Sequence, residues 1–292
     1  MAKYLSPYSA SSTRWLRGNL HGHTCCGRFM DLGESGRFYA RLGYDFVAVT
    51  DHNKAPSKGQ TAGWQQAAGL VVVPGEENGS TDHIIELGVH EVTPTNGSSY
   101  SERAEALRGG GGFIIACHPQ EYPHGADNLR AGAPFLHAVE IYNGLREARG
   151  THEHHNVALW DELLTAGRKL WAVAADDFHC QYISPGHGWV CVQAPEDAGA
   201  LTWENIVEQL KRGAFYASNG PNFKRLEFRG GTLRVEVEKL VRDIRVIGPG
   251  GETLAAHPGP ALSWKAPAGL GYFRVEAHCG VKTAWSQPFF AA

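Results

Sequence analysis

The chain has 292 residues, of which 42% are hydrophobic and 20% are charged, a balance that excludes an intrinsically disordered chain. Its 27 basic and 30 acidic side chains give a formal net charge of −3, so it lacks the overall basic character that binds long nucleic acid. Six cysteines show no zinc-knuckle spacing, and the sequence has neither a long apolar run for a membrane span nor an apolar signal-peptide core. We therefore expect a cytoplasmic protein with reduced thiols and no membrane contact.

Between about residues 15 and 213, short apolar segments alternate with segments of helical periodicity. The apolar segments have the composition of strands buried on both faces of a parallel sheet, and they span residues 14–20, 45–50, 70–74, 113–117, 138–142 and 170–174. Helices are predicted over residues 34–43, 63–69, 99–110, 154–167 and 202–213, and several of these segments end in glycine. The alternation predicts βα units, and hence a barrel or an open doubly wound sheet.

After residue 213 the pattern changes to short segments in which apolar and polar residues alternate. These segments are separated by Gly- and Pro-rich turns, and they span residues 225–230, 232–240, 243–248, 261–267, 272–278 and 282–290. Such a pattern predicts a small antiparallel, sandwich-like β module. We place the boundary near Ser218–Pro221, which gives a first domain of residues 1–218 and a second of residues 219–292.

Histidine is concentrated in the first domain, where 13 of the 15 histidines lie. Several of them, together with carboxylates, directly follow or flank predicted strands: His21 and His23, Asp51 and His52, Glu76 and Glu77, His118, Glu140 and Asn143, and Asp177 and His179. In an α/β barrel the loops after the strands share one face, so these side chains are expected to converge.

The spacing within two of these motifs favours metal binding. In His21-x-His23 and Asp177-x-His179, residues two apart point to the same side of an extended backbone. A single such motif is more often a pair of ordinary strand-end residues, but the ordered set is much harder to obtain by chance. Imidazole with carboxylate suits zinc, manganese or iron in a catalytic site.

Five motifs in order carry a resemblance to a known family: residues 19–24 (NLHGHT), 47–53 (VAVTDHN), 74–78 (PGEEN), 116–119 (ACHP) and 175–179 (ADDFH). Over about residues 15–215 the chain resembles the PHP (polymerase and histidinol phosphatase) metallohydrolases. That resemblance implies a distorted, TIM-like β/α barrel, here expected to be seven-stranded, holding two or three divalent metal ions. Segments 43–53, 139–144, 215–221 and 284–289 further resemble the carbaryl-hydrolase-like branch.

The resemblance also implies roles for individual residues. His21, His23 and Asp177 would bind the first metal, and Glu77 rather than Glu76 would bridge it to the second. The other candidate ligands are His83 and His118 for the second metal and His52 and His179 for a third. Asp51 would orient a ligand histidine, and Glu76 and Asn143 are further candidates for such outer positions.

One departure from the family pattern concerns the third metal. The family usually has an aspartate shortly after the first motif, and here that position falls on or beside Arg28. Either Asp31 substitutes from a longer loop, or the third site is weak or empty. Arg28 is then a fixed cation for an anionic substrate or a solvated surface residue.

Other residues near these motifs carry weaker signals. His187 is the candidate proton donor to a leaving group, and Lys54 either helps to bind phosphate or is solvated. The cluster of residues 152–155 (HEHH) begins a predicted helix, where adjacent side chains point around the cylinder rather than at one ion. Cys25 and Cys26 have no evident base to activate them.

These features predict a metal-dependent hydrolase, foremost a phosphoesterase that uses a metal-bridging hydroxide on a small, anionic phosphate ester. An amide, carbamate or carboxyl-ester hydrolase on the same metal site is the main alternative, because the same nucleophile attacks a carbonyl carbon. A metal-binding accessory domain without activity is the third. The sequence indicates neither the substrate, the metal, nor the oligomeric state.

Overall fold

The computed structural model describes residues 3–9, 13–24, 32–95, 98–150, 156–179, 185–195, 201–238 and 241–292. Its first part alternates strands and helices, as the sequence predicts. In chain order these elements are β1 (Tyr4–Leu5), β2 (Thr13–Asn19), α1 (Leu32–Arg41), β3 (Phe46–Val49), α2 (Lys58–Ala68), β4 (Val71–Asn78), β5 (Ile84–Leu87), α3 (Tyr100–Gly109), β6 (Phe113–Ala116), the 3₁₀ turn η1 (Pro119–Glu121), α4 (Gly125–Gly132), β7 (Ala138–Asn143), α5 (Gly144–Ala148), α6 (Val157–Thr165), β8 (Trp171–Ala175), β9 (Trp189–Pro195), α7 (Trp203–Lys211) and β10 (Phe215–Ser218).

Local sequence explains where two of these helices begin. Ser57 caps α2, accepting from the backbone N–H of Gln60, whose side chain accepts in turn from the backbone of Ser57. Ser99 and Glu102 form the same reciprocal capping box at the start of α3. The helix α2 ends at Gly69, whose φ of 72° is in the left-handed region that glycine adopts without strain.

These strands belong to one curled sheet that contains two sets of parallel strands. Strands β2, β3 and β4 pair in parallel, as do β6, β7 and β8. Between these halves β5 runs antiparallel to both β4 and β6, and β9 runs antiparallel to β2. The inner core of the sheet includes Leu20, Phe46, Phe113 and Phe215, all fully buried.

The fold is consistent with a barrel-like α/β architecture, but the predicted count of seven strands is wrong. The main sheet contains 15 strands, because β5, β9, β10 and strands from both ends of the chain join it. The sequence prediction omitted β5 because its four residues follow β4 through a short turn without a helix between them.

The curl of the sheet brings the segment after β8, the last strand of its order, against the segment after β2. After β2, the backbone N–H of His23 donates to the Phe178 carbonyl at 2.9 Å, and the N–H of Phe178 donates to the His21 carbonyl at 3.2 Å. A second bridge joins His52, after β3, to Glu77 in β4. These links bring the strand-end motifs to one place.

The remaining strands follow residue 218. They are β11 (Phe223–Arg229), β12 (Thr232–Val237), β13 (Asp243–Ile247), β14 (Thr253–Pro258), β15 (Ala261–Lys265), β16 (Tyr272–Cys279), β17 (Lys282–Ser286) and β18 (Phe289–Ala291), with the 3₁₀ turn η2 (Pro249–Gly251). Strands β11, β12 and β15 form a separate antiparallel sheet.

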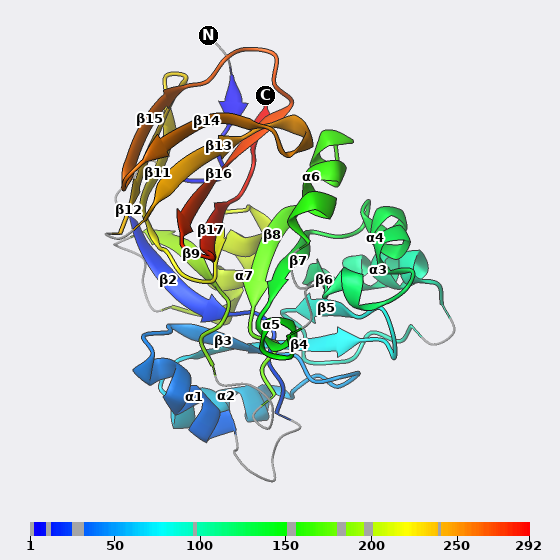
Figure 1. The fold of residues 1–292 in the computed structure, drawn as a ribbon. Helices are drawn as coiled ribbons and strands as arrows, with labels where there is room; N and C mark the ends of the chain where they lie inside the picture. The colour runs from blue at the N-terminus through cyan, green and yellow to red at the C-terminus, as the bar shows by residue number, and fades with distance from the viewer. Residues whose placement is uncertain are drawn as a thin grey trace.

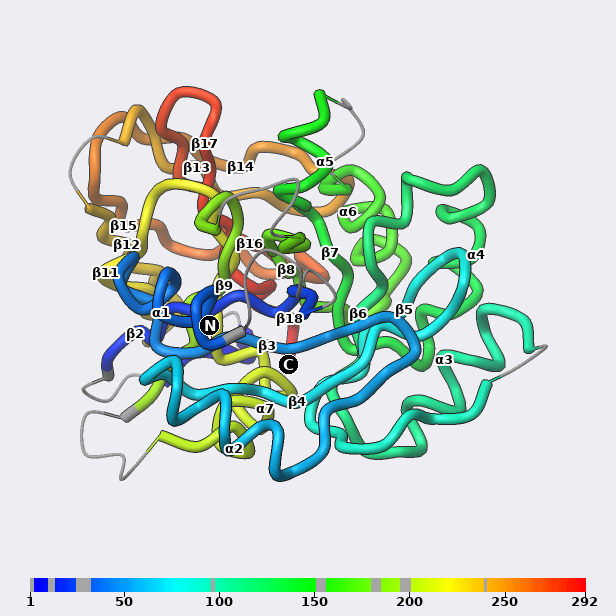
Figure 2. The backbone as a smooth tube through the Cα atoms, turned by 90° about the horizontal axis from the view of Figure 1, so that it is seen from below, coloured from blue at the N-terminus to red at the C-terminus, as the bar shows by residue number. Residues whose placement is uncertain are grey.

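The other C-terminal strands continue the main sheet across the predicted domain boundary. Strand β10 pairs with β17, and β1, at the start of the chain, pairs with β18. In Figure 1 the C-terminal strands gather at the upper left, α1 and α2 lie at the bottom, and α3 and α4 lie at the right. Viewed from below in Figure 2, the C-terminal strands again lie on the opposite side from α3 and α4. The boundary itself stays a prediction.

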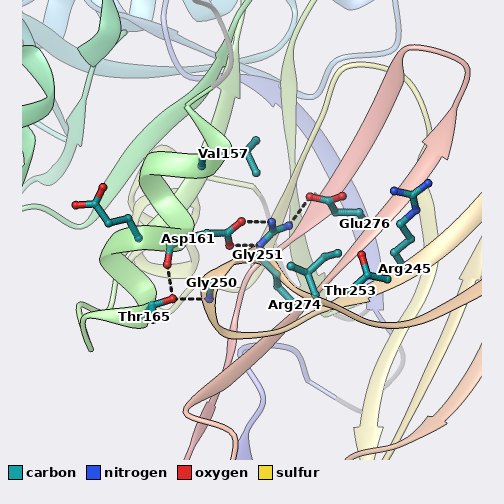
Figure 3. A pocket seen from close by; sticks show the side chains of 12 residues that line it. Val157, Asp161, Thr165, Arg245, Gly250, Gly251, Thr253, Arg274 and Glu276 are labelled. Carbon is teal, nitrogen blue, oxygen red and sulfur yellow. Dashed lines mark hydrogen bonds and ion pairs between the residues drawn. The ribbon is translucent and has the colours of Figure 1, made fainter.

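A buried ion network connects α6 to this C-terminal region (Figure 3). Arg274 in β16 is 1% exposed and donates through Nε and Nη2 to the two carboxylate oxygens of Asp161 in α6, at 2.8 and 2.7 Å. Its Nη1 donates to Glu276 at 2.6 Å.

Among the described helices, none has both the length and the apolar character that a membrane span requires.

Candidate metal centre

The carboxylate of Glu77, near the end of β4, is surrounded by imidazoles. The residue is 1% exposed. Five histidines place a ring nitrogen within 3.4 Å of its two oxygens: His83 Nδ1 at 2.8 Å, His52 Nδ1 at 3.0 Å, His118 Nε2 at 3.2 Å, His23 Nε2 at 3.3 Å and His21 Nε2 at 3.4 Å.

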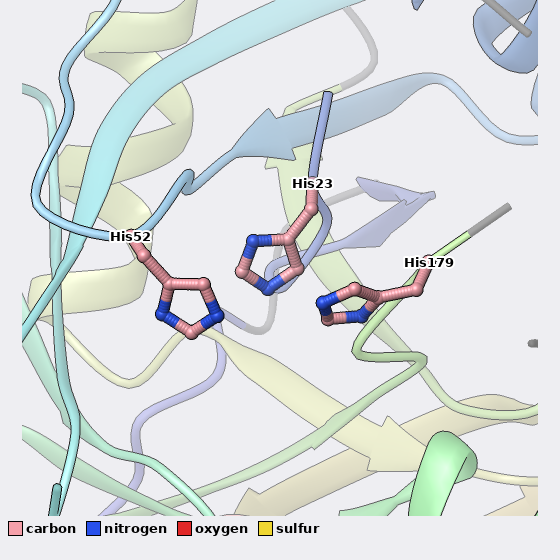
Figure 4. A group of neighbouring side chains, drawn as sticks. All are labelled: His23, His52 and His179. Carbon is pink, nitrogen blue, oxygen red and sulfur yellow. The ribbon is translucent and has the colours of Figure 1, made fainter. Parts of the chain in front are cut away.

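A second carboxylate, that of Asp177 after β8, faces part of the same group. Its Oδ1 lies 3.3 Å from Nε2 of both His21 and His23 and 3.4 Å from Nδ1 of His179. The rings of His23 and His179 have their centroids 4.1 Å apart, and Figure 4 shows the His23 ring between those of His52 and His179.

The structure therefore brings all eight predicted ligands into one cluster. Among the described residues, five overlapping groups place their donor atoms within 4.8 Å of one another: His21, His23 and Asp177; His52, Glu77 and His83; His23, His52 and His179; His21, His118 and Glu140; and His21, Glu77 and Cys117. Each group could hold a metal ion. The assignment of particular ligands to a first, second and third ion stays a prediction.

The burial of this cluster fits a cation. His21 Nε2 and Glu77 Oε2 are buried without a well-formed hydrogen bond in the described chain, which is costly for polar atoms. The set combines imidazole nitrogens with carboxylate oxygens, as zinc, manganese and iron sites do.

Charge interactions among these groups are strong. Burial alone would raise the pKa of Glu77, but the surrounding histidines, His21 first, lower it well below its usual range. The pKa of Asp177 is lowered well below its usual range in the same way, again mainly by His21 against the effect of burial. Both carboxylates are therefore anionic at neutral pH and available to a cation.

A third carboxylate, Glu140 in β7, orients two of the histidines from behind. Its Oε1 lies 3.0 Å from His21 Nδ1, and its Oε2 accepts from the backbone N–H of His118 at 2.9 Å. Asn143 donates from Nδ2 to both Glu140 Oε2, at 2.9 Å, and Asp177 Oδ2, at 3.1 Å. Asn143 therefore connects Glu140 to Asp177, and its role as an outer residue stays a prediction.

Glu121 is an outer residue that the sequence analysis missed. Its Oε2 lies 2.8 Å from His118 Nδ1, and the same oxygen is ion-paired with Arg146. Burial would lower the pKa of His118, but Glu121 and then Glu77 raise it to about 10. Glu121 lies three residues after His118, within the single turn η1, so the only sequence signal was that spacing.

Asp51 is also placed at the edge of the cluster. Its Oδ1 accepts from the backbone N–H of Thr24 at 2.6 Å and lies 3.9 Å from His23 Nδ1. It therefore anchors the segment that follows His23. Lys54 is exposed.

Glu76, in contrast, is not brought to the cluster. Successive side chains of a strand point to opposite faces, and Glu76 faces away from Glu77. Its Oε1 accepts from the backbone N–H of Thr93 at 2.8 Å, and it lies directly across from Glu86 in β5.

Of the remaining predicted residues, the structure describes His187 but not Arg28 or Asp31. The backbone N–H of His187 donates to Asp176 at 2.6 Å, and the role of its imidazole as an acid stays a prediction. Arg28 and Asp31, as well as Cys25, Cys26 and residues 152–155, lie outside the described residues.

Backbone strain is concentrated at this centre. Among the described non-glycine residues, positive φ angles occur at four positions, each a candidate ligand or its chain neighbour: Asn53 (50°), Asp82 (50°), His118 (27°) and Asp177 (53°). Such conformations cost of order 1–3 kcal/mol each and cluster at functional sites.

Comparison with protein-family models and with curated proteins gives no match. Among solved structures, one similar chain is described as a candidate metal-dependent phosphoesterase from Bifidobacterium adolescentis; identity is 14%, the TM-score is 0.46, and the match covers 67% of this chain and 96% of that one. Another is an amidohydrolase from Chromobacterium violaceum with bound sulfate and no metal, with 16% identity, a TM-score of 0.42 and coverage of 66% and 96%. Because both TM-scores lie below 0.5, these likenesses establish no family, and the resemblance to the PHP family stays a prediction.

Proposed function

We propose that the protein is a metal-dependent hydrolase that cleaves a small phosphate ester. The observation that carries this proposal is the buried Glu77 carboxylate, which five imidazole nitrogens approach within 3.4 Å. A carboxylate in that position can be shared between neighbouring cations, and paired metal ions are the usual catalysts of phosphate-ester hydrolysis.

In this proposal His21, His23 and Asp177 would hold one ion, and Glu77, His83 and His118 would hold a second. The third group, which includes His52 and His179, would hold a further ion. Such ions supply Lewis acidity and lower the pKa of water towards neutrality.

The chain itself supplies orientation. Glu140 engages His21 at Nδ1 and Glu121 engages His118 at Nδ1, so each ring presents its Nε2 to Glu77. Carboxylates behind ligand histidines fix the ring and its tautomer and raise its basicity. Asn143 holds Asp177 in the same manner through its amide.

Hydrolysis of an amide, carbamate or carboxyl ester is the second candidate, and one observation favours it. Phosphate recognition normally uses cationic side chains that are free to make bidentate contacts. The guanidinium of Arg146 reaches the outer part of the centre, but it is ion-paired with Glu121. An acyl substrate would not need such a cation.

Three measurements on protein purified without chelator separate these functions. Metal analysis by mass spectrometry should find divalent ions bound to the chain. A p-nitrophenyl phosphate assay should show turnover that a chelator abolishes and added metal restores. If only p-nitrophenyl acetate is turned over strongly, the protein is an acyl hydrolase rather than a phosphoesterase. If no metal is bound, the result favours an accessory domain without activity.

A further inference from the structure

A polar pocket, which we call the basal pocket, lies at the amino-terminal ends of β7 and β8. It has a volume of about 420 Å³, within the range of small-molecule sites. His137 directly precedes β7 and Trp171 begins β8, whereas the candidate metal ligands follow the opposite ends of strands. At 3.3 Å per residue, β7 alone separates the two sites by roughly 17 Å.

The basal pocket is lined by positive charge from three separate segments. Arg108 comes from the last turn of α3 and Lys211 from the last turn of α7, while Arg168 and Lys169 come from the loop between α6 and β8. No aspartate or glutamate of the described chain lines the pocket. Among the described residues, none of these four cations forms an ion pair; the Lys211 ammonium donates instead to the carbonyl of Gly111.

His137 adds a neutral hydrogen-bond donor to this wall. The backbone N–H of Ile114 donates to its Nδ1 at 3.0 Å, so the ring proton is on Nε2. Burial, and then the charges of Arg108 and Lys211, lower the pKa of His137 to about 3. The ring therefore stays neutral at physiological pH and can donate from Nε2.

The rest of the pocket is less polar. The Trp171 indole N–H donates to the Lys211 carbonyl at 3.2 Å, which fixes the ring, and Ala133, Pro134 and Leu136 complete the wall. This side can accommodate the non-phosphate part of a ligand.

A structural role explains only part of the arrangement. Basic residues in the last turn of a helix compensate its dipole, which accounts for Arg108 and Lys211. Lys169 also lies over the Phe290 ring, with its Nζ 5.7 Å from the ring centroid. Neither contact accounts for Arg168, which follows the end of α6 at Thr165, or for the absence of acidic lining residues in the described chain.

We infer that the basal pocket binds the phosphate group of a small phosphorylated molecule. A phosphate dianion accepts charge-assisted hydrogen bonds from arginine and lysine and a further bond from a neutral imidazole N–H. The site is too far from the candidate metal centre for one small molecule to occupy both, so a ligand bound here is a separate molecule from the substrate at the metal centre.

Isothermal titration calorimetry at constant ionic strength tests the inference, with pyrophosphate, inorganic phosphate and AMP as probes on the full, metal-loaded chain. The double variant Arg168→Ala/Lys169→Ala removes two exposed cations of the pocket. Its affinity for pyrophosphate should fall about tenfold or more, since the variant removes two of the four cations that would make charge-assisted hydrogen bonds to phosphate. Tighter binding of AMP than of phosphate would indicate a ligand with an organic part, whereas equal binding would indicate phosphate itself.

Two controls make the result specific. Lys224→Ala/Arg234→Ala removes the same charge from exposed positions of β11 and β12 and should leave binding within about twofold. Glu77→Gln should also preserve it, because the metal centre is a separate site. Binding that survives the pocket variant, or falls equally in the charge-matched control, or disappears in Glu77→Gln, would overturn the inference.

Discussion

Each histidine of the candidate centre has two ring nitrogens, and the contacts determine which one faces the carboxylates. Glu140 engages Nδ1 of His21 and Glu121 engages Nδ1 of His118. The Nε2 atoms of both rings therefore face Glu77. Glu121 belongs to none of the candidate ligand groups of the described residues, whereas Glu140 lies close enough to His21 and His118 to be a candidate ligand itself.

Replacement of Glu121 by Gln should weaken metal binding while the fold persists. The amide keeps the size of the side chain but removes the charge that holds His118 Nδ1. Loss of such an outer partner typically reduces metal affinity about 10–100-fold. Competition with a chromogenic chelator measures this change.

Glu147→Gln is the matched control, because Glu147 pairs with Lys282 rather than with a histidine. Unchanged affinity in Glu121→Gln, or an equal loss in the control, would refute the positioning role.

Glu86, which lies in β5 directly across from Glu76, predicts a pH dependence of stability. Burial, with a further contribution from Glu76, raises the pKa of Glu86 from 4.5 to about 7. A group with a raised folded-state pKa contributes stability that is present below its unfolded pKa and is lost as the pH rises through the folded value. The wild type should therefore lose stability between about pH 4.5 and 7.

Glu86→Gln should flatten that decline, because the amide stays neutral and its oxygen can still accept from the Thr93 hydroxyl. Urea unfolding from pH 5 to 8 gives the slopes, with the exposed Glu208→Gln as control. Parallel curves for wild type and Glu86→Gln would show that Glu86 has no such effect.

Most of the candidate ligands lie in short connections next to strands, and none lies in a described helix. The guanidinium of Arg103, in α3, donates to the carbonyls of Asn78, Thr81 and Asp82 at 3.2, 3.2 and 2.8 Å. These contacts fix the turn between β4 and β5, which presents His83. The turn cannot be recognised from the local sequence, because its anchor lies more than 20 residues further along the chain.

The ion network between α6 and β16 should be important for stability. Arg274→Met would leave the Asp161 carboxylate buried without its bidentate partner. Removing one member of a buried ion pair typically costs about 3–5 kcal/mol. Denaturant unfolding should show a loss of this size, whereas Arg225→Ala, at an exposed pair, should change stability little.

Adding Asp161→Leu to Arg274→Met should recover part of the loss, because the uncompensated charge is removed. A double variant less stable than Arg274→Met would contradict this explanation.

At the scale of the whole molecule, the sequence predicts the strands that carry the candidate ligands better than the sheet that contains them. Six predicted apolar segments correspond to β2, β3, β4, β6, β7 and β8. Their largely apolar character is a local property, and the polar residues at or after their ends are therefore visible in the sequence. The clustering of the eight candidate ligands follows from the parallel strands and from the bridge between Gly22 and Phe178.

Long-range pairing limited the rest of the prediction. Strands β10 and β17 are more than 60 residues apart in the sequence, and β1 pairs with β18 across nearly the whole chain. Neither pairing has a local signal, so the strand count was wrong. Glu121 and Arg103 were missed for the same reason, because their function depends on contacts that only the folded chain creates.

The neighbouring carboxylates of β4 allow the most direct test of the central claim, that Glu77 is the shared carboxylate of a metal centre. Glu76 and Glu77 are both buried but face opposite sides of the strand. Mass spectrometric metal analysis of wild type, Glu77→Gln and Glu76→Gln, each purified without chelator, compares them. The account predicts that wild type and Glu76→Gln carry the same complement of divalent ions and that Glu77→Gln loses at least one. Full metal content in Glu77→Gln, or none in the wild type, would contradict it.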